Sequence, residues 1–210
     1  MVDVSWQPAF VRAAVAALAG TVRHWLYVSS CSVYTDDRTA AQEEDATLHE
    51  PHRGDGPVDW EVYGPAKVAC EQACLAGNGG EHTLVARAGL IGGYGDRTDR
   101  LGYWPARVAR AADTEAVLTP PRGTATQVID VEDLAGWLVS AAVRHTPGVF
   151  NAVGDVTTLG AVLDAAVASC GIAPRFVEAP NVWLAQEGVE PWRGPSRCRC
   201  GCPNRSTPDS

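Results

Sequence analysis

Two spacings of apolar residues alternate along this chain and predict strands and helices in turn. Short apolar runs bounded by turn residues are typical of strands buried on both faces. Longer stretches with apolar residues three and four positions apart predict helices that pack by one side. The predicted strands cover residues 24–30, 82–88, 127–131 and 148–153, and the predicted helices follow Pro8, begin near Tyr63, cover 132–143 and extend from Thr157 or Thr158 to Ser169. Such alternation predicts an α/β protein with a parallel sheet.

Short elements at both ends of the chain complete the pattern. Residues 1–5 predict the stub of a buried strand, and residues 175–179 and 181–187 predict one more strand and one more short helix. Pro65 removes a helical hydrogen bond and is tolerated only in the first turn of a helix. The helix that contains Pro65 is therefore expected to begin close to Tyr63.

The composition is that of an ordinary globular protein and argues against several kinds of partner. With 210 residues, 46% of them hydrophobic, the chain can bury a real core in one domain, with or without a small lobe. The formal net charge of −8 leaves no basic face for nucleic acid or for an anionic membrane. No apolar run approaches the roughly 20 residues that span a bilayer, so we expect no membrane partner and a cytoplasmic location.

Tyr63 and Lys67 are the strongest candidates for catalytic chemistry. Four positions apart on a helix, their side chains rise from one face a turn apart, so an ammonium can sit beside a phenol. The cation stabilises the phenolate and lowers the pKa of the tyrosine from its usual value of about 10, which makes the phenol usable as an acid and a base. Ser30, at the end of a predicted strand, supplies a hydroxyl that can hold a substrate oxygen.

The lysine content of the chain favours this interpretation over an ordinary surface pair on a helix. Of 17 basic residues, 16 are Arg and one is Lys67. A single lysine falls four residues after one of the five tyrosines by chance in about 2% of cases, a small false-positive risk for such a motif. A chain that uses Arg everywhere else carries a compact ammonium with a tunable pKa at this one position.

At these residues the chain resembles the extended short-chain dehydrogenase/reductase superfamily, in its NAD-dependent epimerase/dehydratase group. The resemblance covers roughly residues 1–190 and implies the C-terminal part of a Rossmann-like doubly wound parallel sheet with a small α/β substrate lobe. It rests on four segments in the family's order and spacing: Tyr27-Val28-Ser29-Ser30-Cys31-Ser32-Val33-Tyr34, Tyr63-Gly64-Pro65-Ala66-Lys67 followed by Glu71, Ala86-Arg87-Ala88-Gly89-Leu90-Ile91-Gly92-Gly93-Tyr94-Gly95, and Val128-Ile129-Asp130-Val131-Glu132-Asp133-Leu134-Ala135.

The resemblance also implies roles for single residues. Tyr63 is then the acid and base, Lys67 binds the nicotinamide ribose and lowers the pKa of Tyr63, and Ser30 is the catalytic hydroxyl, with Ser29 as the alternative. The cofactor is NAD or NADP, hydride passes between it and a carbon of a small-molecule substrate, and a homodimer is left open. The residues expected at the cofactor are Ser29, Tyr63, Lys67, Gly89, Leu90 and Ile91.

Two further clusters each allow two interpretations. Glycines at positions 89, 92, 93 and 95 follow a predicted strand, but no helix is expected to start directly after them. We therefore favour a loop whose backbone passes close to the nicotinamide over a phosphate cradle. An arginine group on the next helix could hold a substrate phosphate or carboxylate, although a solvated face is the simpler interpretation. The group consists of Arg97, Arg100, Arg107 and Arg110.

Domain organisation follows from the same resemblance. Residues 1–195 are expected to form a partial NAD(P)-binding domain with an interleaved substrate lobe at roughly 96–126 and 155–190. In the family the first βαβ units, with the glycine-rich turn that binds phosphate, precede the strand at residues 1–5, so an N-terminal truncation is expected. The alternative to an oxidoreductase or epimerase is therefore a catalytically inactive remnant in which nothing holds the pyrophosphate of the cofactor.

Residues 196–210 have a pattern that belongs to no core and to no metal site. Cys198, Cys200 and Cys202 alternate along an extended chain and lack the second ligand pair of a zinc site, so no metal is expected. The tail is expected to be disordered or to result from a frameshift. The other cysteines lie in apolar contexts and are expected to be reduced packing residues: Cys31, Cys70, Cys74 and Cys170.

Overall fold

The computed structural model describes residues 1–36, 39, 42–96, 100–111 and 116–188, and its α/β architecture confirms the predicted fold class. The chain forms two compact units. Unit 1 comprises Met1–Ile91 and Ile129–Gly154, and unit 2 comprises Gly92–Val128 and Asp155–Ser210. The residues predicted for catalysis and for cofactor binding all lie in unit 1.

Unit 1 is built on a four-stranded sheet in which every neighbouring pair of strands is parallel. Its strands are β1 (Val2–Asp3), β2 (Trp25–Ser30), β3 (Thr83–Ala88) and β7 (Gly148–Ala152), in the order β1-β2-β3-β7. The register places Ser29 beside Arg87 and Ser30 beside Ala88. The four predicted strands at residues 1–5, 24–30, 82–88 and 148–153 are thus confirmed, but the first was expected to be buried and its Val2 is 54% exposed.

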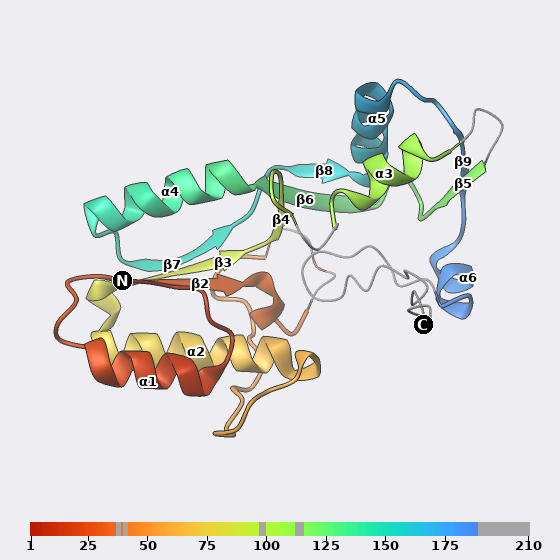
Figure 1. The fold of residues 1–210 in the computed structure, drawn as a ribbon. Helices are drawn as coiled ribbons and strands as arrows, with labels where there is room; N and C mark the ends of the chain where they lie inside the picture. The colour runs from red at the N-terminus through yellow and green to blue at the C-terminus, as the bar shows by residue number, and fades with distance from the viewer. Residues whose placement is uncertain (37–38, 40–41, 97–99, 112–115, 189–210) are drawn as a thin grey trace, which may run out of the picture. The chain divides into compact units, whose positions relative to one another are not determined.

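Helices cover both faces of this sheet (Figure 1). The helices α1 (Pro8–Leu18) and α2 (Tyr63–Asn78) cover one face, and α4 (Val131–Arg144) covers the other. Successive side chains of a strand point to opposite faces, so Trp25 and Tyr27 pack with α1 and α2 while Leu26 packs with α4. Burial on both faces explains why most residues of β2 and β3 are apolar.

The helix α2 begins where the proline argument predicts. A short 3₁₀ turn at Trp60–Val62 leads into it, and Tyr63 is its first residue, so Pro65 lies in the first turn. The carbonyl of Pro65 accepts a hydrogen bond from the backbone N–H of His52 at 2.9 Å. The start of α2 lies against the turn that follows β2, since Gly64 is next to the carbonyl of Ser32.

Two later helices begin at residues whose side chains cap them, and of these caps only that of the second was predicted. Asp130 accepts a hydrogen bond from the backbone of Glu132 at 2.7 Å and caps α4, whose first turn carries Glu132 and Asp133. Both acids lie where the helix dipole favours negative charge. Thr158, one of the two predicted caps, accepts from the backbone of Ala161 at 3.2 Å and starts α5 (Leu159–Cys170).

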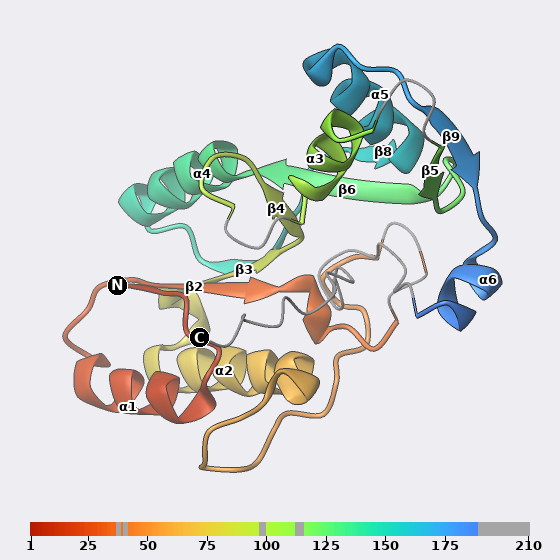
Figure 2. The ribbon, with the colours of Figure 1, turned by 45° about the vertical axis from the view of Figure 1, so that its right-hand side comes forward.

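Most of the remaining elements, which Figure 2 shows from a second side, belong to unit 2. The helices α3 (Tyr103–Ala109) and α5 lie side by side, and the thiol of Cys170 donates to the carbonyl of Pro105 at 3.4 Å. That unit 2 is a substrate lobe stays a prediction. Its other elements are β5 (Ala116–Thr119), which pairs in parallel with β9 (Arg175–Glu178), β6 (Ala125–Asp130), which pairs antiparallel with β8 (Val156–Thr158), and α6 (Asn181–Gln186).

The segment after β3 differs from its prediction. Leu90–Gly92 was expected to belong to a loop, yet it forms the short strand β4, which joins a three-stranded sheet in the order β4-β6-β8. β-Branched and leucine side chains between two glycines suffice for a strand where a neighbouring strand offers hydrogen bonds. Residues 196–210, with their three cysteines, lie outside the described residues.

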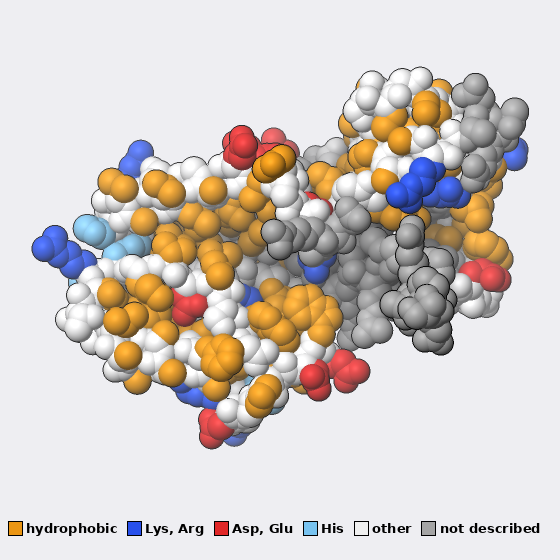
Figure 3. Space-filling view, viewed as in Figure 1, with side chains coloured by type: hydrophobic (Ala, Val, Ile, Leu, Met, Phe, Trp, Pro, Cys, Tyr) orange, Lys and Arg blue, Asp and Glu red, His pale blue; other side chains and the backbone are white. Residues whose placement is uncertain are grey.

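Apolar side chains remain exposed at the start of the chain. Val4 and Phe10 are each 68% exposed, and Val2 on β1 is 54% exposed. The space-filling view shows hydrophobic side chains at the surface of unit 1 (Figure 3). Within the part of the chain that the structure describes, no helix has the length and hydropathy needed to cross a membrane.

Candidate active site

Lys67 is buried on the face of α2 that packs against the sheet. Only 3% of the residue is exposed. Its Nζ donates to the carbonyl of Val28 at 2.8 Å and to the carbonyl of Ser5 at 3.2 Å. An ammonium can donate three hydrogen bonds, so two donors are engaged by the main chain at the end of β2 and in the loop after β1.

The burial of Lys67 changes its acidity. Removal from water disfavours the charged form and lowers the pKa of Lys67 to about 8, although Cys70, Asp3 and Glu71 act in the opposite direction. The side chain is therefore mostly an ammonium at neutral pH, and it becomes neutral at a pH where an exposed lysine stays charged. A cation of this kind can stabilise a developing negative charge beside it.

Tyr63 lies one turn before Lys67 and is half-buried in an aromatic cluster. The Lys67 ammonium is 5.9 Å from the centroid of the Tyr63 ring. The Trp60 ring lies 4.4 Å from the Tyr63 ring, and the Trp6 ring lies 5.7 Å from it. These tryptophans were not predicted for the site, because contacts between Trp6 and residues 60–63 depend on how α2 packs against the loop after β1.

Ser30 lies at the end of β2 and begins the tight turn Cys31–Val33. Its hydroxyl donates to the hydroxyl of Ser32 at 3.1 Å and accepts from the backbone N–H of Ser32 at 3.2 Å. Gly64 lets α2 approach this turn, since a Cβ at Gly64 would lie 2.4 Å from the carbonyl oxygen of Ser32. The helix that begins at Tyr63 therefore meets the turn that begins at Ser30.

Ser29 is the buried neighbour of Ser30, and its hydroxyl has an unusual environment. The residue is 3% exposed, and among the described residues its Oγ has no hydrogen-bond partner. Strand alternation places Ser29 on the same face as Tyr27, which packs with α2. A buried hydroxyl without a partner costs free energy, so Ser29 is a candidate donor to a ligand.

Gly89, Leu90 and Ile91 serve mainly the protein interior. The backbone of Gly89 donates to Ala152 at 3.1 Å, and a Cβ at Gly89 would lie 2.9 Å from a methyl of Val153. Leu90 is 2% exposed, and Ile91 packs against the core cluster that contains Leu134. Glycines 89, 92 and 95 have the spacing Gly-x-x-Gly-x-x-Gly, but the strand β4 follows Gly89 where a phosphate-binding turn would lead into a helix.

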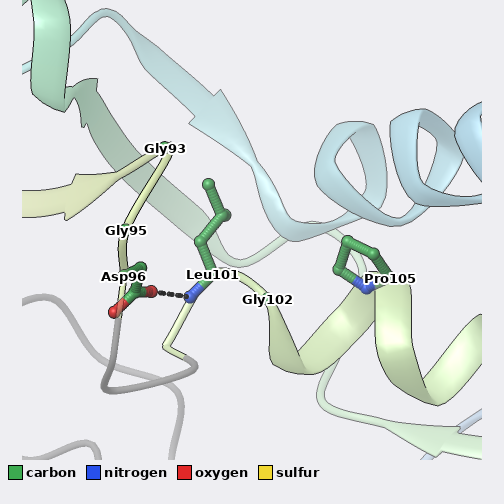
Figure 4. Close-up of a pocket in the computed structure, with 6 residues that line it drawn as sticks. All are labelled: Gly93, Gly95, Asp96, Leu101, Gly102 and Pro105. Atoms are coloured by element: carbon green, nitrogen blue, oxygen red, sulfur yellow. Dashed lines mark hydrogen bonds between the residues drawn. The ribbon is translucent and has the colours of Figure 1, made fainter.

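Unit 2 has a pocket of about 430 Å³ beyond β4 (Figure 4). The carboxylate of Asp96 accepts a hydrogen bond from the backbone N–H of Leu101 at 3.3 Å, and both residues line the pocket. None of the arginines at 100, 107 and 110 lines it, and Arg97 lies outside the described residues, so the anion site stays a prediction. The lining residues are Gly93, Gly95, Asp96, Leu101, Gly102 and Pro105.

A buried ion pair beside the site was also not predicted. The guanidinium of Arg87 donates to both carboxylate oxygens of Glu71, from Nε at 3.2 Å and from Nη2 at 2.9 Å. The sequence motif includes Glu71 after Lys67 but does not indicate its partner. The available signal was Arg87, because an arginine within an apolar strand needs a buried partner for its charge. The described residues contain no group of three or more metal-ligating side chains.

Comparison with known proteins identifies relatives of this architecture. The sequence profile of the NAD dependent epimerase/dehydratase family matches residues 9–152. UDP-N-acetylglucosamine 4-epimerase from Bacillus cereus superposes with a TM-score of 0.66 at 17% identity, over 90% of this chain and 68% of that chain. A putative epimerase from Burkholderia cenocepacia superposes with a TM-score of 0.63 at 20% identity, over 80% of this chain and 54% of that chain.

A third solved structure is that of UDP-glucose 4-epimerase from Thermus thermophilus in complex with NAD, with a TM-score of 0.55, 20% identity, and 84% and 62% of the two chains covered. No curated protein sequence matches this chain with significance. The chain spans 54% of the length of several structures that it matches. The structural likeness shows a Rossmann-like fold, and the profile match over residues 9–152 shows that the chain belongs to the NAD dependent epimerase/dehydratase family.

Proposed function

We propose that this protein is an NAD(P)-dependent oxidoreductase or epimerase that acts on a hydroxyl or carbonyl carbon through Ser30, Tyr63 and Lys67. The observation that carries the proposal is the environment of Lys67, the single lysine of the chain. It is 3% exposed, it is held by two main-chain oxygens, and it lies one helical turn from Tyr63. A lysine kept in this position at the expense of its solvation is typical of a functional site.

Each of the three side chains has a distinct role in the proposal. The phenol of Tyr63 gives a proton to the substrate oxygen or takes one from it. The Lys67 ammonium, 5.9 Å from that ring, stabilises the phenolate form and so lowers the pKa of Tyr63. The hydroxyl of Ser30, now bonded to Ser32, donates to the same substrate oxygen and holds it at the phenol.

The described residues fit the nicotinamide end of a dinucleotide. Lys67 has a third donor for a ribose hydroxyl, and Ser29 has a buried hydroxyl without a partner. A bound nicotinamide would supply or accept the hydride. Matching structures hold NAD, NADP or NADPH, which supports either cofactor. We carry Gly89, Leu90 and Ile91 into the proposal through their backbone alone, since Leu90 and Ile91 pack their side chains into the interior.

The pyrophosphate end has no matching site among the described residues of unit 1. A phosphate site needs a helix N-terminus behind a glycine-rich turn, but β3 leads into β4, and α4 opens with Glu132 and Asp133. This observation favours a second candidate, a catalytically inactive chain in which nothing holds the pyrophosphate of the cofactor. In that case the intact dinucleotide binds the 210-residue chain no more tightly than about 1 mM.

A binding experiment separates the two candidates. Nicotinamide mononucleotide and NAD(H) are titrated against the chain while the fluorescence of its tryptophans is recorded, since Trp6 and Trp60 flank Tyr63. The proposal expects nicotinamide mononucleotide to change this fluorescence in the wild type and not in Lys67→Met. If neither compound binds but the chain is folded, the second candidate is favoured. Turnover of a carbonyl substrate by the same preparation contradicts the second candidate.

The proposal extends to the substrate class, the oligomeric state and the cellular location. Matching structures include an epimerase of UDP-glucose and a protein in complex with UDP-glucose and NAD, so nucleotide sugars are the first substrate class to assay. Exposed Val4 and Phe10 support a homodimer, because exposed apolar surface marks interaction sites. Four free cysteines within the described ranges support a cytoplasmic location.

A further inference from the structure

Arg87 and Glu71 form an ion pair in the interior of unit 1. Their side chains are 5% and 3% exposed, and the two parallel hydrogen bonds between them are 3.2 and 2.9 Å long. A bidentate pair of this kind fixes both the distance and the angle between its partners. The pair joins the middle of α2 to β3, the strand that lies beside β2.

A buried ion pair is a poor means of stabilising a fold. The cost of removing both charges from water offsets much of their attraction, and apolar residues of similar volume often serve stability as well or better. What such a pair supplies is a defined geometry, which apolar contacts leave looser. The location of the pair decides whether that geometry matters for the site.

The pair joins α2, which carries Tyr63 and Lys67, to β3, the neighbour of the strand β2 that ends at Ser30. Glu71 follows Lys67 by four positions, so it lies on the same face of α2 one turn further along. Arg87 lies beside Ser29 of the neighbouring strand β2, and the next residue of β3, Ala88, lies beside Ser30. A shift of α2 along its axis would therefore have two effects at once. It would break the ion pair, and it would move Lys67 away from the carbonyl of Val28.

The remaining donors of Arg87 extend the connection to the loop after Ser30. Its Nη1 donates to the hydroxyl of Tyr34 at 2.9 Å and to the carbonyl of Glu44 at 2.8 Å. The Tyr34 hydroxyl in turn donates to the side-chain oxygen of Asn151 on β7 at 2.6 Å. One guanidinium thus holds α2, the segment after the Ser30 turn and, through Tyr34, the next strand of the sheet.

We propose that Arg87 and Glu71 are positioning residues, which set the axial position of α2 so that Lys67 reaches the carbonyls of Val28 and Ser5. The inference rests on the proposed function, because it concerns how Tyr63 and Lys67 are held for catalysis. Its test observes Lys67 directly and needs neither substrate nor cofactor. The positioning role can therefore fail while the proposed catalysis stands, and the reverse also holds.

The single lysine of the chain makes the test direct. Lysine labelled with ¹³C at Cε gives one NMR signal, which belongs to Lys67 and titrates with its pKa of about 8. The main variant, Glu71→Leu with Arg87→Met, removes both buried charges and adds no lysine. We expect it to unfold in urea no more easily than the wild type, while the Lys67 pKa rises by about one unit or more toward that of a solvated lysine.

A second variant keeps the proposal testable if the double variant does not fold. Glu71→Gln preserves the shape of the side chain but cannot form the bidentate pair. The negative charge of Glu71 raises the pKa of Lys67, so loss of that charge alone would lower the Lys67 pKa, whereas displacement of α2 raises it. The two explanations therefore predict opposite signs, and we expect a rise.

The matched control is the ion pair of Arg122 with Asp164 in unit 2. Its atoms are 2.6 Å apart, and the side chains are 29% and 70% exposed. Arg122→Met with Asp164→Leu is expected to leave the Lys67 titration at its wild-type midpoint. A folded Glu71 variant whose Lys67 pKa is unchanged or lowered would overturn the positioning role, since the pair would then act only through its charge or through stability.

Discussion

The main-chain oxygen of Ser5 accepts a hydrogen bond from Lys67, 62 positions later in the chain, over a distance of 3.2 Å. The same oxygen accepts a second hydrogen bond from the hydroxyl of Tyr27, at 2.8 Å. The backbone N–H of Ser5 donates to Asp3 at 2.8 Å, which fixes the loop after β1. Main-chain oxygens of two segments, the loop after β1 and the strand β2, therefore hold the Lys67 ammonium by hydrogen bonds. Its orientation is fixed in the absence of a ligand.

Removal of the Tyr63 hydroxyl tests its role as acid and base. In any preparation of this protein that turns over, Tyr63→Phe is expected to lower kcat by about 10²–10⁴-fold, because general acid-base groups contribute on that order. NAD(P)H oxidation with nucleotide-sugar carbonyl substrates measures the loss. Tyr103→Phe on α3 is the control and is expected to keep wild-type turnover. Retention of more than about a tenth of kcat by Tyr63→Phe would contradict the role.

The buried Lys67 predicts an unusual pH dependence of stability. Its pKa is lowered to about 8 in the folded chain from 10.5. Below pH 8 both states carry the charge, and the folded state bears the full cost of burying it. Between pH 8 and 10.5 the folded state releases the proton first, so stability rises with pH.

Lys67→Met isolates this effect, since it removes the titrating ammonium and leaves every tyrosine and cysteine in place. Between about pH 7.5 and 10.5, the free energy of unfolding of the wild type is expected to rise relative to Lys67→Met by roughly 3 kcal/mol. Urea titrations at several pH values measure both proteins. A difference that stays constant over this range would mean that Lys67 is not buried as a cation.

The fold could be predicted from sequence where a pattern has one physical explanation. β2 and β3 are apolar because both faces of the sheet are covered, and Pro65 fixes the start of α2 within a residue or two. β4 was not predicted as a strand, because a three-residue strand between glycines has no periodicity and forms only where a neighbouring strand lies. β5 and β8 are similarly short, and no strand was predicted at either.

The candidate site could likewise be predicted only where a local pattern determines which residues meet. Tyr63 and Lys67 are four residues apart on one helix, so sequence alone places them together. Contacts between distant segments depend on packing that no local pattern encodes, which is why the approach of Trp6 to Tyr63 and the pairing of Arg87 with Glu71 were not predicted. The roles of Ser29 and Ser30 stay predictions, although the structure shows that their hydroxyls differ, one unpartnered and one bonded to Ser32.

Gly64 sets the distance between α2 and the turn after Ser30. A Cβ there would lie 2.4 Å from the carbonyl oxygen of Ser32, which cannot move without disturbing that turn. Gly64→Ala is therefore expected to lower the free energy of unfolding by about 1–3 kcal/mol, a cost typical of overpacking. Gly136→Ala on α4 is the control, because a Cβ there meets no atom within 4 Å and alanine favours a helix.

The glycine pair is measured by urea unfolding of the two variants and the wild type. We expect Gly136→Ala to raise stability by about 0.5–1 kcal/mol, since alanine restricts the unfolded chain. If the two variants had the same free energy of unfolding, the turn at Ser32 would move readily to make room for the added methyl group. The close approach of α2 would then not be required for stability.

His24 predicts a loss of stability in acid. The residue precedes β2 and is 6% exposed, and its Nε2 lies 3.0 Å from the carbonyl of Thr146. Burial lowers the pKa of His24 below 6.5; the hydrogen bond to Thr146 opposes this, while His145, the N-terminal ammonium and His82 add to it. As the pH falls through 6.5, the unfolded chain takes up a proton on His24 before the folded chain does, so stability is lost.

His24→Gln tests this explanation, because its amide can still donate to Thr146 and does not titrate. Between about pH 7.5 and 5, the wild type is expected to lose more stability than His24→Gln, as measured by the urea midpoint at each pH. His82→Gln is the control, since the His82 side chain is 59% exposed and its loss should leave the acid dependence of the wild type almost intact. If His24→Gln lost stability as steeply as the wild type, the carboxylates of the chain and not His24 would account for its acid sensitivity.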